Sequence, residues 1–176
     1  DLVFSDLDYA IEKGPDFKQP VYASKTLAKA LKAKVLLYTQ RYAEAATLAQ
    51  EVIVENKVKL EKTFGDVFKN KFNSVEALFA TPFDDKSERN NKPFVFRTTY
   101  TLTPEYRSLM ASDARKAVAI NGLQGNGKFM GTTLNNVTLA ADTEYFLRLA
   151  EVYLIRAVVA VLRMSGMRST PSGKEP

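Results

Sequence analysis

The sequence predicts a mainly α-helical protein, with helical hairpins, long irregular loops and short β segments. Two observations indicate this fold class. Residues 25–53 hold two apolar helical stripes on either side of a short turn, and residues 143–164 hold a third, longer stripe. Between them, residues 60–100 lose the helical spacing and include a long polar stretch. Apolar residues that recur every three or four positions mark one face of a helix, so helices form the scaffold and the middle of the chain forms loops.

The composition is that of an ordinary globular protein, with 45% apolar and 26% charged residues among 176. The net charge is +5, but the lysines are spread along the chain and no nucleic-acid-binding module is recognisable. Cysteine and histidine are both absent. Their absence excludes thiolate nucleophiles, Cys/His zinc sites, disulfides and histidine-based catalytic triads. We therefore expect no enzymatic activity, no cofactor and no metal.

Residues 1–13 predict a short amphipathic helix, which Gly14–Pro15 ends. Its expected apolar face consists of Leu2, Leu7, Ala10 and Ile11. Ser24 is the expected N-cap of the next helix, residues 25–39, because its hydroxyl can accept a hydrogen bond from an unpaired amide of the first turn. The apolar face expected for this helix consists of Leu27, Ala30, Leu31, Val35 and Leu37.

After a turn at Gln40–Arg41, residues 42–53 predict a second helix of the hairpin. Its stripe consists of Tyr42, Ala45, Ala46, Ala49, Val52 and Ile53. The small alanines allow the two helices to approach closely. The pair resembles a tetratricopeptide unit, although Lys29 stands at the usual tryptophan position and Ala33 at the usual glycine. No second copy follows in phase, so a simple solenoid is not predicted.

The middle of the chain predicts two extended segments, 77–83 and 94–100, separated by a polar loop. Thr103 and Pro104 are typical of a helix start, and that helix is expected to run to about residue 111. Residues 117–143 contain four glycines and several asparagines and predict a loop or irregular hairpin.

Thr143–Glu144 is expected to open a long helix that ends near Met164. Helical spacing would then pair Arg148 with Glu144 and Glu151 on its surface. These charges, with Arg156, exclude the segment as a membrane span. We expect one helical domain over residues 1–164 and a disordered tail over 165–176. Four aromatic residues on helical apolar faces are expected in the core: Tyr38, Tyr42, Phe146 and Tyr153.

No motif predicts catalysis. The loop 122–129 approaches the spacing of a phosphate-binding loop, but Phe129 replaces the serine or threonine that would hold magnesium. The carboxylates Asp84, Asp85 and Glu88 lack the spacing of a calcium-binding loop. Asn136 begins a glycosylation triplet, and such triplets arise often by chance.

Aromatic residues in or beside the predicted loops are the feature that best suits a ligand surface. They are Phe94, Phe96, Tyr100 and Tyr106. Such rings can stack on the apolar face of a sugar, or they can line a second core. The sequence leaves both interpretations open.

Three stretches resemble the SusD/RagB family of outer-membrane nutrient-binding lipoproteins. Residues 6–11 look like the motif before the family's central helix pair, and residues 26–53 look like that pair. Residues 145–157, with the run Arg-Leu-Ala-Glu-Val-Tyr-Leu-Ile-Arg-Ala, look like its late helix. Residues 76–79 and 113–115 fit weaker family features. The resemblance covers roughly residues 1–160 and implies a piece of the central-to-C-terminal part of such a protein.

This resemblance implies a non-catalytic cell-surface protein that binds an oligosaccharide or other nutrient and hands it to a SusC-like TonB-dependent transporter. It implies an outer-membrane location, through a lipid anchor in the N-terminal part of the full-length protein, outside this chain. The ligand-binding residues that we expect are Asn90, Phe96, Arg97, Tyr100 and Tyr106. Tryptophan, a common sugar platform in the family, is absent.

The alternative function is a tetratricopeptide-like protein-interaction module whose hairpin groove holds a partner peptide. A concave groove lined by Lys25, Lys29 and Lys32 would favour this reading. A hairpin packed against the late helix would argue against it.

Overall fold

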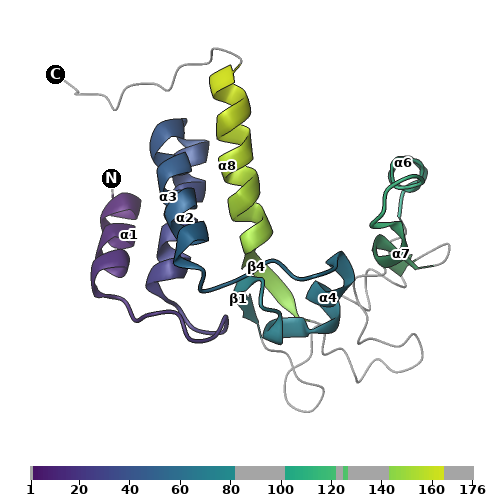
Figure 1. The fold of residues 1–176 in the computed structure, drawn as a ribbon, viewed down its shortest axis with the longest axis horizontal. Coiled ribbons are helices and arrows are strands. Elements are labelled where there is room, and N and C mark those ends of the chain that lie inside the picture. Colours follow the sequence, from purple (N-terminus) through teal and green to yellow (C-terminus); the bar gives the residue numbers. More distant parts are fainter. Residues whose placement is uncertain (1, 82–101, 122–124, 127–142, 165–176) are drawn as a thin grey trace. The chain divides into compact units, whose positions relative to one another are not determined.

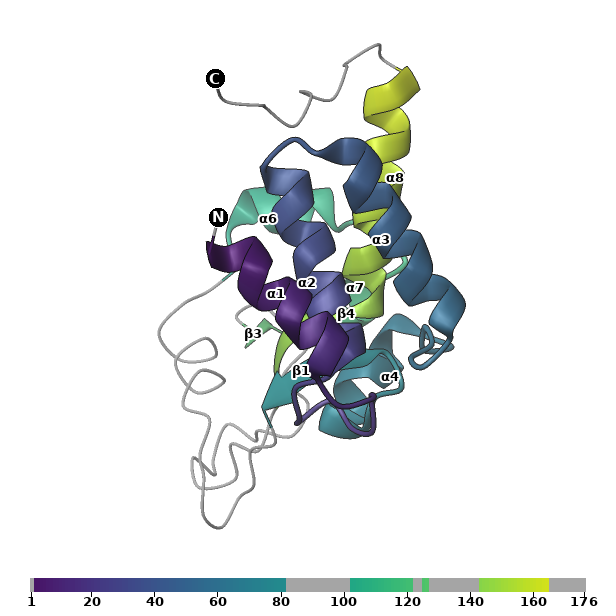
Figure 2. The same ribbon diagram turned by 90° about the vertical axis from the view of Figure 1, so that its left-hand side faces the viewer.

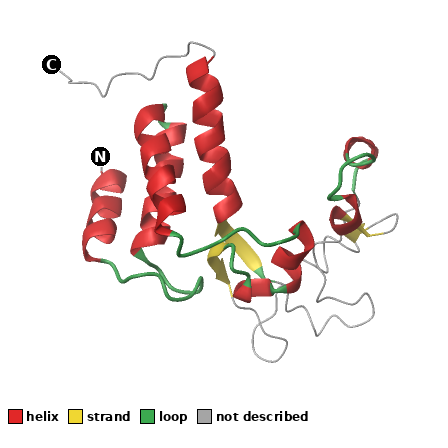
Figure 3. Cartoon of the chain, in the orientation of Figure 1, coloured by secondary structure: helices red, strands yellow, loops and turns green. Residues whose placement is uncertain are grey.

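The computed structural model describes residues 2–81, 102–121, 125–126 and 143–164 (Figure 1). The chain divides into two compact units. The first, here called the helical unit, comprises Asp1–Leu60, Glu76–Phe79 and Phe146–Pro176. The second, here called the mixed unit, comprises Glu61–Val75 and Ala80–Tyr145. The prediction of a mainly helical fold with short β segments is confirmed (Figure 3).

Four helices build the helical unit: α1 (Leu2–Lys13), α2 (Lys25–Tyr38), α3 (Tyr42–Glu55) and α8 (Leu149–Met164). Helices α2 and α3 form the predicted hairpin. Helix α1 packs against α2, while α8 packs against α3 and α2, as both views of the ribbon show (Figures 1 and 2). The hairpin is therefore covered on two sides by elements from opposite ends of the sequence.

The hairpin begins and turns where the sequence predicts. The Ser24 hydroxyl accepts a hydrogen bond from the Leu27 amide at 3.2 Å, as an N-cap does. At the turn, Gln40 has a φ of 61°, and Asn56 ends α3 with a φ of 52°. Asparagine tolerates this left-handed conformation better than most residues, so its place at the end of α3 is favourable.

Small residues form the contact between the hairpin helices. Ala30, Ala33, Ala45 and Ala49 are fully buried, and they belong to the same core as Leu36, Val52 and Val152. The absence of larger side chains at these positions lets the helix backbones approach closely.

The buried face of α2 differs from the predicted one. Leu31 is 42% exposed, whereas Leu36, which the pattern omitted, is 2% exposed. The buried residues of α2 are Thr26, Ala28, Ala30, Ala33 and Leu36. Because α2 contacts three other helices, its buried surface is wider than one stripe, and a single period does not locate it.

Helix α1 also buries a different set. Leu7 is buried as predicted, but Leu2 is 76% exposed. Phe4 packs against the core instead, and the guanidinium of Arg41 lies 4.7 Å from the centre of its ring. A cation over an aromatic face is attractive, so this contact helps to hold α1 on the hairpin.

The late helix begins later than predicted. Residues 144–148 form a strand, β4 (Glu144–Arg148), which pairs with β1 (Ala77–Thr81). The division between the two units falls within both strands. The Leu149 amide donates to the Glu76 carbonyl at 3.0 Å, and Arg148 Nη1 lies 3.3 Å from Glu76 Oε1. These contacts with a distant residue override the helical pattern at the start of the segment.

The strand changes the predicted ion pairs. Residues 144 and 148 do not lie on successive helical turns, so the predicted helical pairing is wrong. Arg148 pairs with Glu76, and Glu151 pairs with Lys34 at 2.7 Å between Nζ and Oε1. The interactions that the pattern assigned to one helix thus connect different elements of the helical unit.

Three of the four aromatic residues expected in the core are exposed. Tyr38 is 77% exposed, Phe146 and Tyr153 are also exposed, and Tyr42 is partly buried against the core. For Phe146 the reason is the strand: successive side chains alternate, so Leu147 is buried while Phe146 faces outward and contacts the ring of Phe79.

Helix α8 has apolar residues on its outward side as well. Leu154, Val158 and Val161 are exposed, although Val152, Ile155 and Val159 on the inward side are buried. No helix within the described ranges is long and apolar enough to cross a membrane.

The mixed unit contains α4 (Phe64–Lys69) and the 3-10 turn η1 (Lys71–Asn73), where the sequence predicted no helix. Helix α4 starts with a capping box, in which Thr63 and Asp66 each accept a hydrogen bond from the other's backbone amide. The Tyr145 hydroxyl lies 2.6 Å from the Val67 carbonyl and 2.9 Å from the Lys71 carbonyl. Local capping and this distant contact explain a helix that is too short to show a period.

The rest of the mixed unit follows the prediction in part. Helix α6 (Pro104–Leu109) begins at the expected cap, Thr103. Beyond it lie α7 (Lys116–Ala119) and a two-residue antiparallel pair, β2 (Ile120–Asn121) with β3 (Gly125–Asn126). This pair fits the loop or irregular hairpin predicted for 117–143 where the structure describes it, and residues 127–142 lie outside the described ranges. The α7 turn was not predicted. Segment 94–100, the polar loop before it and the tail 165–176 lie outside the described residues.

We predict that Leu36→Ala lowers the free energy of unfolding by about 2–5 kcal/mol, because it leaves a cavity in the core between the hairpin and α8. The matched variant Leu31→Ala, on the same helix but exposed, should change it by less than about 0.5 kcal/mol. Urea denaturation followed by circular dichroism measures both. Equal effects would show that the buried face of α2 is assigned wrongly.

We predict that Arg148→Met lowers the free energy of unfolding by up to about 3–5 kcal/mol, because it leaves the Glu76 carboxylate, 5% exposed, without this partner. Adding Glu76→Gln should recover part of the loss, since the amide carries no charge. A double-mutant cycle in urea measures the coupling. Additive effects of the two substitutions would contradict the pairing.

Candidate functional site

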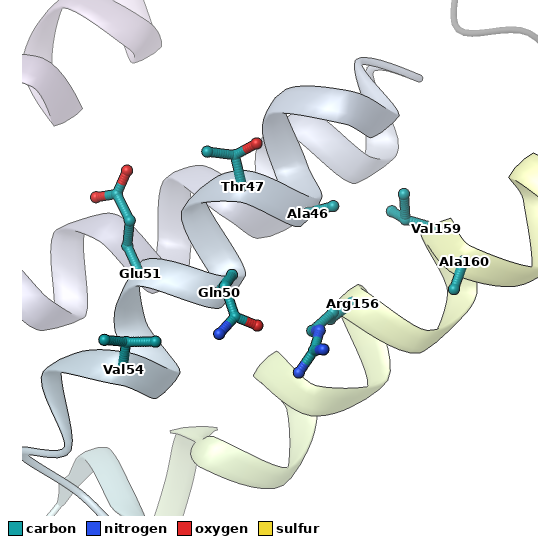
Figure 4. A pocket seen from close by; sticks show the side chains of 8 residues that line it. All are labelled: Ala46, Thr47, Gln50, Glu51, Val54, Arg156, Val159 and Ala160. Carbon is teal, nitrogen blue, oxygen red and sulfur yellow. The ribbon is translucent and has the colours of Figure 1, made fainter.

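An open pocket lies between α3 and α8 in the helical unit (Figure 4). Its volume is about 640 Å³, within the range of ordinary small-molecule sites. It is lined by Ala46, Thr47, Gln50, Glu51, Val54, Arg156, Val159 and Ala160. We call it the α3–α8 pocket.

Small side chains leave the space open. Ala46 on α3 and Ala160 on α8 line the pocket, and neither reaches far from its own helix (Figure 4). Val159 is buried and belongs to the core, while Val54 is exposed at the rim. The pocket therefore has an apolar wall, against which the carbon skeleton of a ligand could pack.

Gln50 places an unsatisfied polar atom in this pocket. Its Oε1 is buried and has no hydrogen-bond partner among the described residues. A buried carbonyl oxygen without a donor costs about 1–3 kcal/mol. Such an atom calls for an explanation, and an ordered water or a ligand hydroxyl could supply the donor.

Arg156 faces the pocket from the opposite wall, and its side chain and that of Gln50 both extend between the helices (Figure 4). Arg156 is exposed, and none of the ion pairs found among the described residues includes it. The guanidinium is always charged and presents a planar set of donors. It can therefore hold an external acceptor, above all a carboxylate.

The remaining polar side chains of the pocket are engaged elsewhere. Thr47 and Glu51 point away from α8 (Figure 4), and the Thr47 hydroxyl donates to the Ala43 carbonyl at 3.0 Å. Glu51 Oε2 lies 3.2 Å from Lys29 Nζ, which also contacts Glu55 at 2.6 Å. The hydrogen bond to Glu55, and less strongly the one to Glu51, raise the pKa of Lys29 against the opposing effect of burial. The negative charge of Glu51 is thus balanced within the hairpin.

A second, smaller pocket of about 330 Å³ lies on the hairpin. Two of its lining residues are charged groups that already have partners: Lys32 pairs with Asp8, and Glu44 pairs with Arg41. The hydrogen bond from Arg41 lowers the pKa of Glu44. This pocket offers fewer unsatisfied groups to a ligand than the α3–α8 pocket does.

Tyr106, the one predicted ligand-binding residue that the structure describes, is not among the residues that line this pocket. Asn90, Phe96, Arg97 and Tyr100 lie outside the described residues, as do Asp84, Asp85, Glu88 and most of the glycine loop. Tyr106 lies on α6 in the mixed unit, partly buried, with its amide donating to Thr103 Oγ1 at 3.2 Å. The assignment of these residues to a ligand site remains a prediction.

Sequence reasoning missed Gln50 and Arg156. A signal for Arg156 exists, because the residues three and four positions away on either side are Val152, Tyr153, Val159 and Ala160, none of them acidic. With no acidic neighbour three or four positions away, the exposed Arg156 is available to a partner from outside its own helix. No comparable signal marks Gln50. Among the described residues, no group of three or more acidic side chains could hold a metal ion.

Comparison with known proteins gives similarity in structure only. No family model matches the chain, and no curated protein matches it. A SusD superfamily protein from Bacteroides thetaiotaomicron VPI-5482 superposes with a TM-score of 0.72 at 20% identity, over 93% of this chain and 42% of that one. A laminarin-binding SusD-like protein gives 0.66 at 23% identity, over 95% and 53%.

A SusD-like carbohydrate-binding protein from Bacteroides vulgatus ATCC 8482 gives a TM-score of 0.67 at 15% identity, over 98% of this chain and 43% of that one. The chain therefore has the SusD-like fold, which confirms the resemblance seen in its sequence at the level of fold. It spans between two fifths and about half of the length of these structures.

We predict that Gln50→Leu raises the free energy of unfolding by about 1 kcal/mol or more, because an apolar side chain of similar size replaces the unsatisfied oxygen. Thermal and urea denaturation measure the change. Gln50→Ala, which also removes the amide but enlarges the pocket, should gain less. A Leu variant less stable than the natural chain would show that the amide has a stabilising role that its contacts do not reveal.

Proposed function

We propose that this chain belongs to a protein that binds carbohydrate without transforming it. The observation that supports the proposal is the SusD-like fold, shared over more than nine tenths of the chain with solved structures described as laminarin-binding and carbohydrate-binding.

The setting that we propose is the outer surface of a bacterial outer membrane. There the full-length protein, held by an N-terminal lipid anchor, would pass its ligand to a SusC-like TonB-dependent transporter. The support is the sequence resemblance of the hairpin and the late helix, together with the shared fold. Both the partner and the location are proposals for the whole protein.

For the glycan surface we retain the predicted residues in and near the middle loops. An exposed tyrosine ring offers a flat apolar face to a pyranose, and asparagine and arginine offer hydrogen bonds to its hydroxyls. Tyr106 is the predicted residue that the structure describes. It follows the cap of α6, which fixes its position on a regular element.

The alternative, a peptide-binding hairpin groove, is less well supported. The three lysines expected to line the groove each lie near a carboxylate: Lys25 near Asp16, Lys29 near Glu51 and Glu55, and Lys32 near Asp8. Helix α8 packs against the hairpin, which is the arrangement that argues against an open groove.

We predict that the chain is retarded in affinity gels cast with its glycan, and that Tyr106→Ala weakens the binding about tenfold or more through loss of ring stacking. Tyr100→Ala should act in the same direction. The matched control is Tyr38→Ala, which removes a tyrosine 77% exposed on α2 in the helical unit. A panel of neutral and acidic glycans is needed because the ligand is not assigned.

One result would overturn the proposal of carbohydrate binding, and a second would overturn only the predicted surface. If the chain keeps its helical content but binds no glycan in the panel, the proposal of carbohydrate binding is wrong. Equal loss of glycan affinity in the Tyr38→Ala and Tyr106→Ala variants would show that the predicted surface is wrong, while carbohydrate binding by the chain would stand.

A further inference from the structure

The α3–α8 pocket contains two polar groups of different kinds, a hydrogen-bond acceptor and a charged hydrogen-bond donor. Gln50 Oε1 is buried and lacks a donor among the described residues, whereas Arg156 is a cation that lacks an acid there. The two face the same space from opposite helices (Figure 4). Arg156 is exposed, so water can reach its guanidinium. A ligand that contacts both groups would bring a donor for Gln50 and an acceptor, best an anion, for Arg156.

The charge around the pocket favours an anion at Arg156. The one acidic residue in its lining, Glu51, points away from α8 and lies 3.2 Å from Lys29. It therefore neither neutralises the guanidinium nor strongly repels an anion beside it. A guanidinium binds a carboxylate with two parallel hydrogen bonds, which are about twice as strong as bonds between neutral groups.

The rest of the pocket suits a hydroxyl-bearing ring. The volume of about 640 Å³ exceeds what one carboxylate needs. Ala46 and Ala160, which are not buried, offer an apolar surface for ring carbons. A ring hydroxyl can donate to Gln50 Oε1, the atom that the chain leaves unsatisfied.

We infer that the α3–α8 pocket binds an acidic sugar, with the carboxylate of a uronic acid on Arg156 and a ring hydroxyl donating to Gln50. This inference rests on the proposed function, because it takes the ligand class to be carbohydrate. It adds a second candidate site, built from α3 and α8, and a charge preference that the fold does not supply.

The test uses three probes that differ only around the carboxyl group: trigalacturonic acid, its fully methyl-esterified form, and galactotriose. Isothermal titration calorimetry with the 176-residue chain measures their binding. We expect trigalacturonic acid to bind about 10- to 100-fold more tightly than either neutral probe, the range expected for charged hydrogen bonds. Raising the salt concentration should weaken the acidic probe selectively.

Substitutions then locate the site. Arg156→Met should reduce the affinity for trigalacturonic acid to that of the neutral probes, and Arg156→Lys should recover part of it, because charge remains but the planar fork is lost. Gln50→Leu should weaken all three probes, since all three carry ring hydroxyls. The control Lys59→Gln removes one positive charge from an exposed residue outside the pocket and should have no effect.

The outcomes are separable. Equal affinity for the acidic and neutral probes would overturn the inference and leave carbohydrate binding in place. Preference for the acidic probe that survives Arg156→Met, or that Lys59→Gln abolishes equally, would overturn the pocket assignment. Binding to none of the three probes would overturn the inference, and binding to no glycan of the wider panel would also overturn the proposed function.

Discussion

Glu76 determines where the late helix begins, and the arrangement of the helical unit depends on that start. Its carbonyl accepts the Leu149 amide, and its buried carboxylate pairs with Arg148. Together these contacts end strand β4 and set the rotation of α8. With that rotation, Val152 and Val159 face the hairpin and Arg156 lies at the edge of the contact, beside α3. A shift of one residue would turn each of these side chains by about 100°.

Alanine has opposite effects on two sides of helix α3. Where Ala45 and Ala49 meet the small residues of α2, the backbones approach and the core is closed. Where Ala46 of α3 and Ala160 of α8 line the same pocket, space remains. The difference lies in the neighbouring helix: α2 packs closely against Ala45 and Ala49, whereas α8 leaves space beside Ala46. Packing and the pocket therefore come from the same residue type, used on two sides of one helix.

Local signals in the sequence were sufficient for the hairpin. Ser24, the turn at Gln40 and the alanine stripe of α3 all act within a few residues, and the structure has them as predicted. The start of α8 was predicted wrongly because its cause, Glu76, lies far away in the sequence. The exposure of Leu31 and the burial of Leu36 depend on how many helices surround α2, which periodicity does not encode. The pocket could not be predicted from the sequence for a similar reason, since Gln50 and Arg156 come together only when α8 packs on α3.

The exposure of Arg156 has a consequence for how a ligand would leave the α3–α8 pocket. The residue is exposed at the edge of the contact between α3 and α8, so water and salt reach its guanidinium. Dissolved ions screen interactions between exposed charges. An acidic sugar in this pocket would therefore be released by competing anions or by a rise in ionic strength, without any movement of the two helices.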